Sequence, residues 1–506
     1  MHYLSVLGCL GVALSSPALA SAPEPEAIRT AAPADAVPAD AATAPDNQSQ
    51  RREEVRLMRA QIADLAARAE AMEADLGGGT PTDAAARKDA AERVVYRLTP
   101  APDAPPSAAS SGRALATVQD AADDGHKFEI YGFGQVDYIY DFNRVDPAWD
   151  DAFRPSKIPT EEGAFGSDGQ SSLSAKQSRL GAKASGMAGG RPYEAKFEFD
   201  LFGTGVDAGQ TTFRLRHAYG RWGPVLGGQT NTLFMDGDVF PNVIDYWGPT
   251  GMVFVRTPQL RYIISDDPTF YAAVAIEKPG NDIDAGQIRQ IDPDLAAGLT
   301  NTEKWPDLTG QMRWTGGWGH VQLAGIVRQL GFETVGAPDQ EPKGDELGWG
   351  LNGTTAFKMG SAATGRVGVV YGEGIASYMN DGGMDMAPRV TGELQPPNLV
   401  ILRGHAEAVP LLGITAYLDY AWSEHWSSAI GYSLTQVDNT NFQEPTAYHR
   451  GEYASANILW TPTPRVMTGA ELMWGQRTDN GGARGDDVRL QVSFKASFTS
   501  NDFFNH

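Results

Sequence analysis

The feature that most constrains this chain is a strict alternation of apolar and charged residues, which begins about a quarter of the way along it. The stretch TFRLRHAYGRW shows the pattern well. Phe213, Leu215 and Tyr219 fall on one parity, whereas Arg214 and Arg216 fall on the other. Successive side chains of a β-strand point to opposite faces of the sheet. One face of this strand is therefore apolar, and the other carries arginines.

The same alternation recurs along the rest of the chain. It appears in KFEIYGFGQVDYIYDF, YEAKFEFDLF, DLTGQMRW, GHVQLAGIVRQ, GITAYLDYAW and VRLQVSFKASF. Strands of about ten residues with one apolar and one polar face are typical of transmembrane barrels. A soluble sandwich also alternates, but its strands are shorter and its apolar face meets a second sheet. Aromatic residues gather near the expected strand ends, where a membrane interface would lie: Tyr138, Tyr140, Phe142, Trp422, Trp426 and Trp460.

We therefore predict an all-β transmembrane barrel over residues 126–506, with its strands between 126 and 498. At about 23 residues for each strand and its loop, this region holds 16 antiparallel strands, which is the porin size class. Phe213 and Leu215 would face lipid, and Arg214 and Arg216 would face water inside, because a lipid-facing arginine costs about 2–4 kcal/mol near the midplane. His217 shares the lipid parity, so we expect it near an interface or a local twist.

The first 125 residues have a different composition. Residues 1–22, MHYLSVLGCLGVALSSPALASA, predict a signal peptide, and the Ala- and Pro-rich residues 23–50 and 77–125 predict linkers. Residues 51–76 predict a coiled coil, because their apolar residues are spaced 3-4-3-4-3-4. The residue types on this seam lean toward two strands, and a single amphipathic helix is the alternative. The seam consists of Val55, Met58, Ile62, Leu65, Ala69, Met72 and Leu76.

Charge and motifs exclude several classes of function. The net charge of −22 argues against general nucleic-acid binding. Beyond the N-terminus no run of 18 apolar residues occurs, so a helical membrane span is not expected. The eight histidines show no metal spacing, and no helix follows Gly132-x-Gly134. We therefore expect neither a metal nor another cofactor. No Ser-His-acid constellation stands out, so we expect no enzymatic activity.

Several segments resemble the DcaP-like family of trimeric outer-membrane porins. They are GGQTNTLFMDGDVFPNVIDYWGPTGMVFVRTPQLRY (227–262), GWGHVQLAGIVR, GEGIASYMND and YASANILWTPTPRVMTGAELMWG. The resemblance covers nearly all of 126–498, and the family also carries a coiled coil before its barrel. It implies a 16-stranded barrel, a homotrimer in outer-membrane lipid, a trimeric coiled coil in the periplasm, and diffusion of small anions, dicarboxylates among them. Outer-membrane barrels commonly end on an aromatic residue of the last strand, whereas here TSNDFFNH follows Phe498. Either Phe504 is the terminal aromatic signal, or these residues are an exposed extension.

The resemblance and the alternation together point to a pore, whose selectivity depends on the charges where it narrows. We predict that residues 232–251 fold into the lumen, as a loop after an early hairpin does in porins generally. This segment carries Asp236, Asp238 and Asp245. The opposing wall would be basic, because arginine stays charged and offers a planar fork to carboxylates. The basic candidates are Arg214, Arg216, Arg179, Lys183, Arg256 and Arg261.

Alternatives remain at each of these levels. The arginines could simply neutralise Glu198, Asp200 or the loop aspartates. Asp236 and Asp238 could bind calcium, although a simple turn is the preferred interpretation. For the whole chain, the preferred function is an outer-membrane porin for small hydrophilic, anionic solutes. A structural tether that uses the coiled coil for periplasmic contacts, or a barrel-form membrane enzyme, remains open.

Overall fold

The computed structural model describes residues 125–395 and 399–501. The predicted signal peptide, both linkers, the coiled coil at 51–76 and Phe504 lie outside these residues. No helix within the described ranges is long and apolar enough to cross a membrane.

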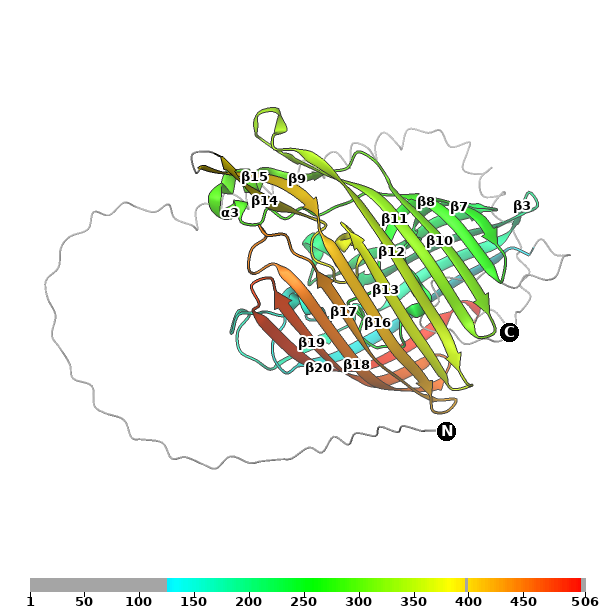
Figure 1. Ribbon diagram of the computed structural model, residues 1–506. Coiled ribbons are helices and arrows are strands. Elements are labelled where there is room, and N and C mark those ends of the chain that lie inside the picture. Colours follow the sequence, from blue (N-terminus) through cyan, green and yellow to red (C-terminus); the bar gives the residue numbers. More distant parts are fainter. Residues whose placement is uncertain (1–124, 396–398, 502–506) are drawn as a thin grey trace, which may run out of the picture. The chain divides into compact units, whose positions relative to one another are not determined.

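Eighteen strand segments of the described chain form one sheet (Figure 1). They are β1 (Lys127–Asp141), β2 (Gln170–Ser174), β3 (Arg179–Ala188), β4 (Arg191–Phe202), β5 (Thr211–Trp222), β6 (Val225–Asn231), β7 (Arg256–Asp266), β8 (Phe270–Glu277), β9 (Leu299–Thr302), β10 (Asp307–Gly316), β11 (Gly319–Thr334), β12 (Gly344–Met359), β13 (Ala363–Glu373), β16 (Pro410–Ala421), β17 (Trp426–Val437), β18 (Tyr448–Thr463), β19 (Val466–Asp479) and β20 (Arg484–Thr499).

These segments make a closed barrel of 16 antiparallel strands, as the alternation predicts. Two of the 16 strands are each built from two pieces, because β2 and β3 both pair with β1, and β9 and β10 both pair with β11. The first strand, β1, pairs with the last, β20. Closure gives every strand of the barrel a neighbour on each side, which is what a chain in hydrocarbon requires.

The two ends of the barrel differ. At one end only a few residues separate consecutive strands, as between β5 and β6 or between β10 and β11. The hairpin of β14 (Met386–Gln395) and β15 (Leu399–Ala408), with β9 and the short helix α3 (Ile288–Ile291), gathers at the other end (Figure 1). A second helix, α4 (Pro293–Gly298), follows α3. Six 3-10 helices lie in loops of the described chain: Pro147–Trp149, Pro155–Lys157, Gly205–Asp207, Gly237–Val239, Pro338–Gln340 and Ala376–Tyr378.

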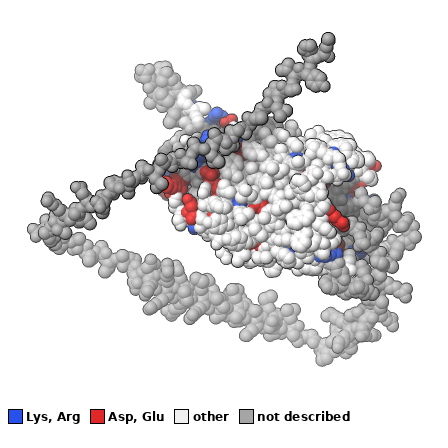
Figure 2. Space-filling view, turned by 90° about the horizontal axis from the view of Figure 1, so that it is seen from below, with Lys and Arg blue, Asp and Glu red and all other residues white. Residues whose placement is uncertain are grey.

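The outer wall is apolar and the inner wall is polar. Phe213 is 75% exposed and Leu215 is 40% exposed, whereas Arg216 is 6% exposed, so the predicted faces of this strand are confirmed there. The same division holds on β11, where Leu323 is exposed and Gln322 is buried inside. Figure 2 shows one side of the barrel as a largely uncharged surface, with charged side chains toward its ends.

The parity prediction is wrong beyond Arg216. Glu198 of β4 pairs with His217, but the next residue of β4 pairs with Leu215, so Arg216 is the extra residue of a β-bulge. The bulge turns both Arg216 and His217 inward and reverses the parity of the residues that follow. Tyr219, which the alternation places on the lipid face, therefore points inward and donates a hydrogen bond to Glu194.

Most of the apolar core lies inside the barrel rather than between two sheets. Residues 232–255, between β6 and β7, fold inward and bury Phe234 and Val253. The segment after β13 buries Ile375 and Met379 in the same cluster. The long β1–β2 loop buries Phe153 in a second cluster, against β18 and β19. Three segments of the described chain thus fold inward and narrow the lumen, and the sequence predicted one of them.

Candidate pore constriction

The first part of the inward segment 232–255 is fixed to the wall formed by β8 and β10–β12. The Leu233 amide donates to Glu277 over 3.0 Å. Asp236 lies 3.3 Å from an Arg313 nitrogen and 2.7 Å from His320 Nε2, and it accepts a hydrogen bond from Thr354 over 2.7 Å. Because each partner lies on a different strand, this one carboxylate joins the loop to three strands.

Asp238 also binds Arg313, and the Arg366 guanidinium donates to the Asp238 carbonyl. Both of the first two predicted loop aspartates therefore pair with cations of the wall that they touch. Within the described residues no group of three or more metal-ligating side chains is close enough to hold an ion. Because both carboxylates pair with Arg313, Asp236 and Asp238 anchor the loop to this wall.

The middle of the segment crosses to the opposite wall. The Asn242 amide donates to Asp419 of β16 over 3.2 Å, and Asn457 of β18 donates to the Asn242 carbonyl over 2.8 Å. The Ile244 amide donates to Glu471 of β19. Asp245, the third predicted aspartate, caps backbone amides: it accepts from Phe153 over 3.0 Å and from Gly248 over 2.6 Å.

Tyr246 then attaches the segment to the predicted basic wall. Its hydroxyl donates to Asp200 over 2.6 Å and accepts from Arg216 over 2.7 Å. It also accepts from Arg214, and its ring stacks on Phe202 with centroids 4.3 Å apart. The structure therefore brings Arg214 and Arg216 to the inward loop, as predicted, and it adds Asp200 to the same contact.

An acidic strand separates the basic ones on this wall. In the register of the sheet, Asp200 of β4 lies between Arg179 of β3 and Arg214 of β5. Arg214 binds Asp200 over 2.8 Å, and Arg216 binds both Asp200 (2.9 Å) and Glu198 (2.8 Å). Glu198 also lies 3.7 Å from Arg179. Opposite charges directly across neighbouring strands stabilise the pairing, and here they largely compensate Arg214 and Arg216.

Arg256, the first residue of β7, differs from its neighbours. Arg216, Arg179 and Arg214 lie near enough to repel it electrostatically, and Asp200 lies near enough to attract it. Its guanidinium lies 4.9 Å from the Phe254 ring, and no carboxylate of the described chain is within ion-pairing distance. Arg256 is therefore a cation of this wall that has no ion-paired carboxylate among the described residues.

Lys495 of β20 is a second cation without an ion-paired carboxylate among the described residues. Its ammonium lies 5.4 Å from the ring of Phe133, and Arg179 lies 5.3 Å from the same ring. Arg179 and Lys495 thus flank the inward-facing ring of Phe133. The alternation on β1 does not predict this arrangement.

Lys183 and Arg261, the remaining predicted cations, lie nearer the short turns. Lys183 is 3.4 Å from Glu194. Arg261 donates to the Asn231 carbonyl over 2.8 Å and to Gln259 over 3.0 Å. Neither contacts the inward loop at Tyr246.

The sequence missed a contact among all three inward segments. Arg154 of the β1–β2 loop lies 4.4 Å from the Trp149 ring and 4.7 Å from the Trp247 ring, and it pairs with Asp381 over 2.9 Å. Trp247 donates to the Asn380 carbonyl over 2.6 Å. The stretch of sequence that contains Asp381 is GEGIASYMND, which supports the family resemblance but has no local pattern that predicts this contact.

Nearby, outside the strands, burial and the neighbouring Arg154 lower the pKa of Lys157. This lysine also lies 5.6 Å from the Trp149 ring. Cations and indole rings therefore meet where the three segments join.

Comparison with known proteins places this geometry in context. A family model described as DcaP outer membrane protein matches residues 108–372, just over half of the chain. The outer membrane channel DcaP of Acinetobacter baumannii is 23% identical, with a TM-score of 0.60 over 74% of this chain and 99% of that one. This likeness shows a shared fold. No curated protein matches the sequence.

Two further solved structures are more distant. An anion-selective porin from Comamonas acidovorans is 11% identical, with a TM-score of 0.45 over 74% of this chain and 100% of that one. The outer membrane protein OmpT of Vibrio cholerae, folded in vitro, is 12% identical, with a TM-score of 0.43 over 75% and 100%. Similarity at this level does not bear on function.

Proposed function

Because this chain belongs to the DcaP family of outer membrane proteins, we propose that it is an outer-membrane porin for small hydrophilic, anionic solutes. The closed barrel, its apolar outer wall and its polar inner wall support passive diffusion through the lumen. The inward segment 232–255 supplies the constriction. Dicarboxylates are the solutes that the family resemblance favours.

The observation that carries anion preference is the uncompensated charge at Arg256. A guanidinium without a carboxylate partner, in a narrow passage with low-dielectric walls, raises the local concentration of anions. Arg179 and Lys495, which flank Phe133, extend the positive field. Arginine can also bind a carboxylate through two parallel hydrogen bonds.

Arg214 and Arg216 receive a different role in this proposal. Their charges are balanced by Asp200 and Glu198, and both contact Tyr246. We assign them the task of holding the inward loop in place, while Arg256 sets the sign of selectivity.

The assembly belongs to the same proposal. We propose a homotrimer in outer-membrane lipid, with residues 51–76 forming a coiled coil in the periplasm. Three helices tethered to three adjacent barrels would meet at a high effective concentration, which favours a third strand over the dimer that their seam alone suggests.

The test is the reversal potential of the purified protein in a planar bilayer under a potassium chloride gradient. Wild type is expected to prefer chloride. Arg256→Ala should weaken that preference, whereas Arg256→Lys, which keeps the charge, should retain most of it. Arg214→Ala with Arg216→Ala should shift selectivity toward cations, because Asp200 would lose both of its ion-paired arginines and Glu198 would lose one of its cations. Cation preference in the wild type would refute the anionic proposal and leave the barrel intact.

A further inference from the structure

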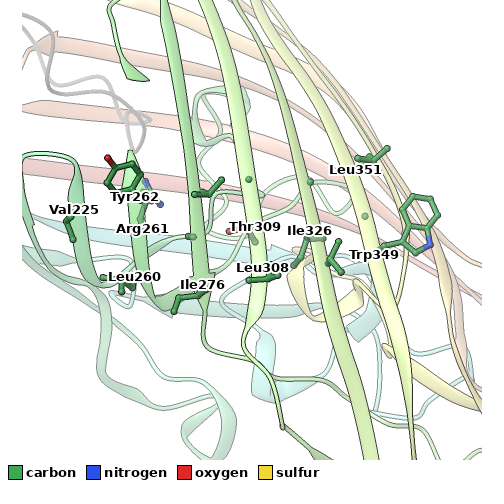
Figure 3. Close-up of a pocket in the computed structure, with 16 residues that line it drawn as sticks. Val225, Leu260, Arg261, Tyr262, Ile276, Leu308, Thr309, Ile326, Trp349 and Leu351 are labelled. Atoms are coloured by element: carbon green, nitrogen blue, oxygen red, sulfur yellow. The ribbon is translucent and has the colours of Figure 1, made fainter. Parts of the chain in front are cut away.

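A groove of about 800 Å³ runs across the outer wall of the barrel, away from the lumen. Its floor is the pair Gly310 of β10 and Gly325 of β11, which face each other in the sheet. A Cβ at Gly310 would meet no atom closer than 3.9 Å, and one at Gly325 none closer than 3.6 Å. The two missing side chains leave a trough between larger apolar neighbours such as Leu308 and Leu351 (Figure 3).

The groove follows one row of the sheet, at right angles to the strands. Neighbouring strands lie about 4.8 Å apart, so a row that crosses six strands is about 24 Å long. The row, in register from strand to strand, is Val225, Tyr262, Val274, Gly310, Gly325 and Leu351.

One end of this row lies at the rim of the barrel. Val225 directly follows the short β5–β6 turn, whereas Leu351 lies well before the turn that ends β12. With strands tilted by about 40°, the row rises by about 15 Å from the rim into the wall. The acyl chains of one leaflet reach about 15 Å into a bilayer, so the groove spans the depth that one chain occupies.

A cation stands at the rim end of the groove. Arg191 is exposed and lies 4.7 Å from the ring of Trp222, the residue that pairs with Val225. Its side chain also rests against Gly223, where an added Cβ would meet its Cδ at 3.2 Å. Within the described chain no carboxylate forms an ion pair with Arg191. An arginine in this position suits a lipid phosphate.

We propose that this groove holds one acyl chain of an anionic phospholipid whose phosphate is bound by Arg191. In outer-membrane barrels the short turns face the periplasm, so the lipid belongs to the periplasmic leaflet. The occupant is a lipid rather than a second copy of the chain, because the groove follows a single row of the sheet and its rim end lies near Arg191, a cation with no ion-paired carboxylate among the described residues.

The probe is phosphatidylglycerol, added to the full-length protein in detergent and detected by native mass spectrometry, with phosphatidylcholine as the comparison. Wild type should retain one phosphatidylglycerol per protomer. Gly310→Leu with Gly325→Leu fills the floor and displaces at least two methylenes, so retention should need about tenfold more lipid. Ala416→Leu, which adds bulk to the exposed wall of β16 away from the groove, is the control and should bind as wild type does.

Arg191→Gln distinguishes binding of the lipid headgroup from binding of the acyl chain. It should remove the preference for phosphatidylglycerol over phosphatidylcholine while some lipid is still retained. Equal retention by wild type and the double glycine variant would overturn the proposal. A double variant that instead loses its oligomeric state, with no lipid on the wild type, would make the groove a contact between subunits. The bilayer conductance of the double variant should stay unchanged, so this result is independent of the proposed porin function.

Discussion

Tyr246 shows how a single hydroxyl can hold a pore loop in place. It donates to Asp200 and accepts from Arg216, so it links the inward segment to a buried group of opposite charges. Buried charges are costly unless each has partners. Asp200 is fully buried, and Arg214, Arg216 and Tyr246 supply those partners.

Replacing Tyr246 with Phe should therefore loosen the loop without emptying its aromatic site. The ring still stacks on Phe202, but Asp200 loses a donor. We expect a loss of about 1–3 kcal/mol in the free energy of unfolding, measured by denaturant titration of the folded barrel. Single-channel recordings should show more current noise. Phe199→Tyr, on the outer wall, serves as a control that adds a hydroxyl elsewhere. An unchanged noise spectrum would mean that Tyr246 does not hold the loop.

The faces of the strands were predictable residue by residue, and the bulge was not. Alternation places Phe213 outside and Arg214 inside, because a lipid-facing charge is penalised. Beyond Arg216 the pattern fails, since Glu198 pairs in register with His217 and leaves Arg216 as the extra residue, bound to Glu198 and Asp200. A bulge depends on cross-strand partners, which a single strand's periodicity does not contain.

At the scale of elements, the inward segment is held by carboxylates on several walls rather than by its own structure. Asp236 is the clearest case, because it joins Arg313, His320 and Thr354 on three strands. A loop without regular secondary structure satisfies its backbone through such contacts, as the Leu233 amide does with Glu277.

Asp236→Asn should release the first half of the loop. Arg313 would keep only Asp238, and removal of one partner from a buried ion pair costs about 3–5 kcal/mol. We expect a lower unfolding free energy and larger, flickering conductance. Combining it with Arg313→Met should recover part of the lost stability, because the unpaired cation is then gone. If the double variant is no more stable than Asp236→Asn alone, this pairing is not what holds the segment.

Of the three inward segments, only 232–255 could be predicted from the sequence. It is long, it follows an early hairpin and it carries three aspartates among aromatic residues. The other two meet it through Arg154 and Asp381, which are 227 residues apart. Contacts at that separation leave no local pattern, so the join at Trp247 emerges only from the folded barrel.

For the molecule as a whole, the proposed anion preference does not conflict with the acidic composition of the chain. The net charge is −22, yet the β3–β7 wall leaves Arg256 uncompensated. A pore's selectivity follows the local field at its narrowest point rather than the total charge. The barrel class, its size and its lipid face followed from alternation, whereas the balance between paired and unpaired arginines depends on the register of β3, β4 and β5.

The barrel should conduct without the region that precedes it. Residues 125–501 close on themselves through the pairing of β1 with β20, and every contact of the proposed constriction lies within them. Deleting residues 23–125 while keeping 1–22 for export should leave the reversal potential and the conductance of each pore unchanged in planar bilayers. If residues 51–76 form the trimeric coiled coil, the same deletion should lower the resistance of the trimer to dissociation in detergent. A deletion variant that folds but no longer conducts would contradict this prediction of the porin proposal, whereas a structural tether would lose its periplasmic contact on the same deletion.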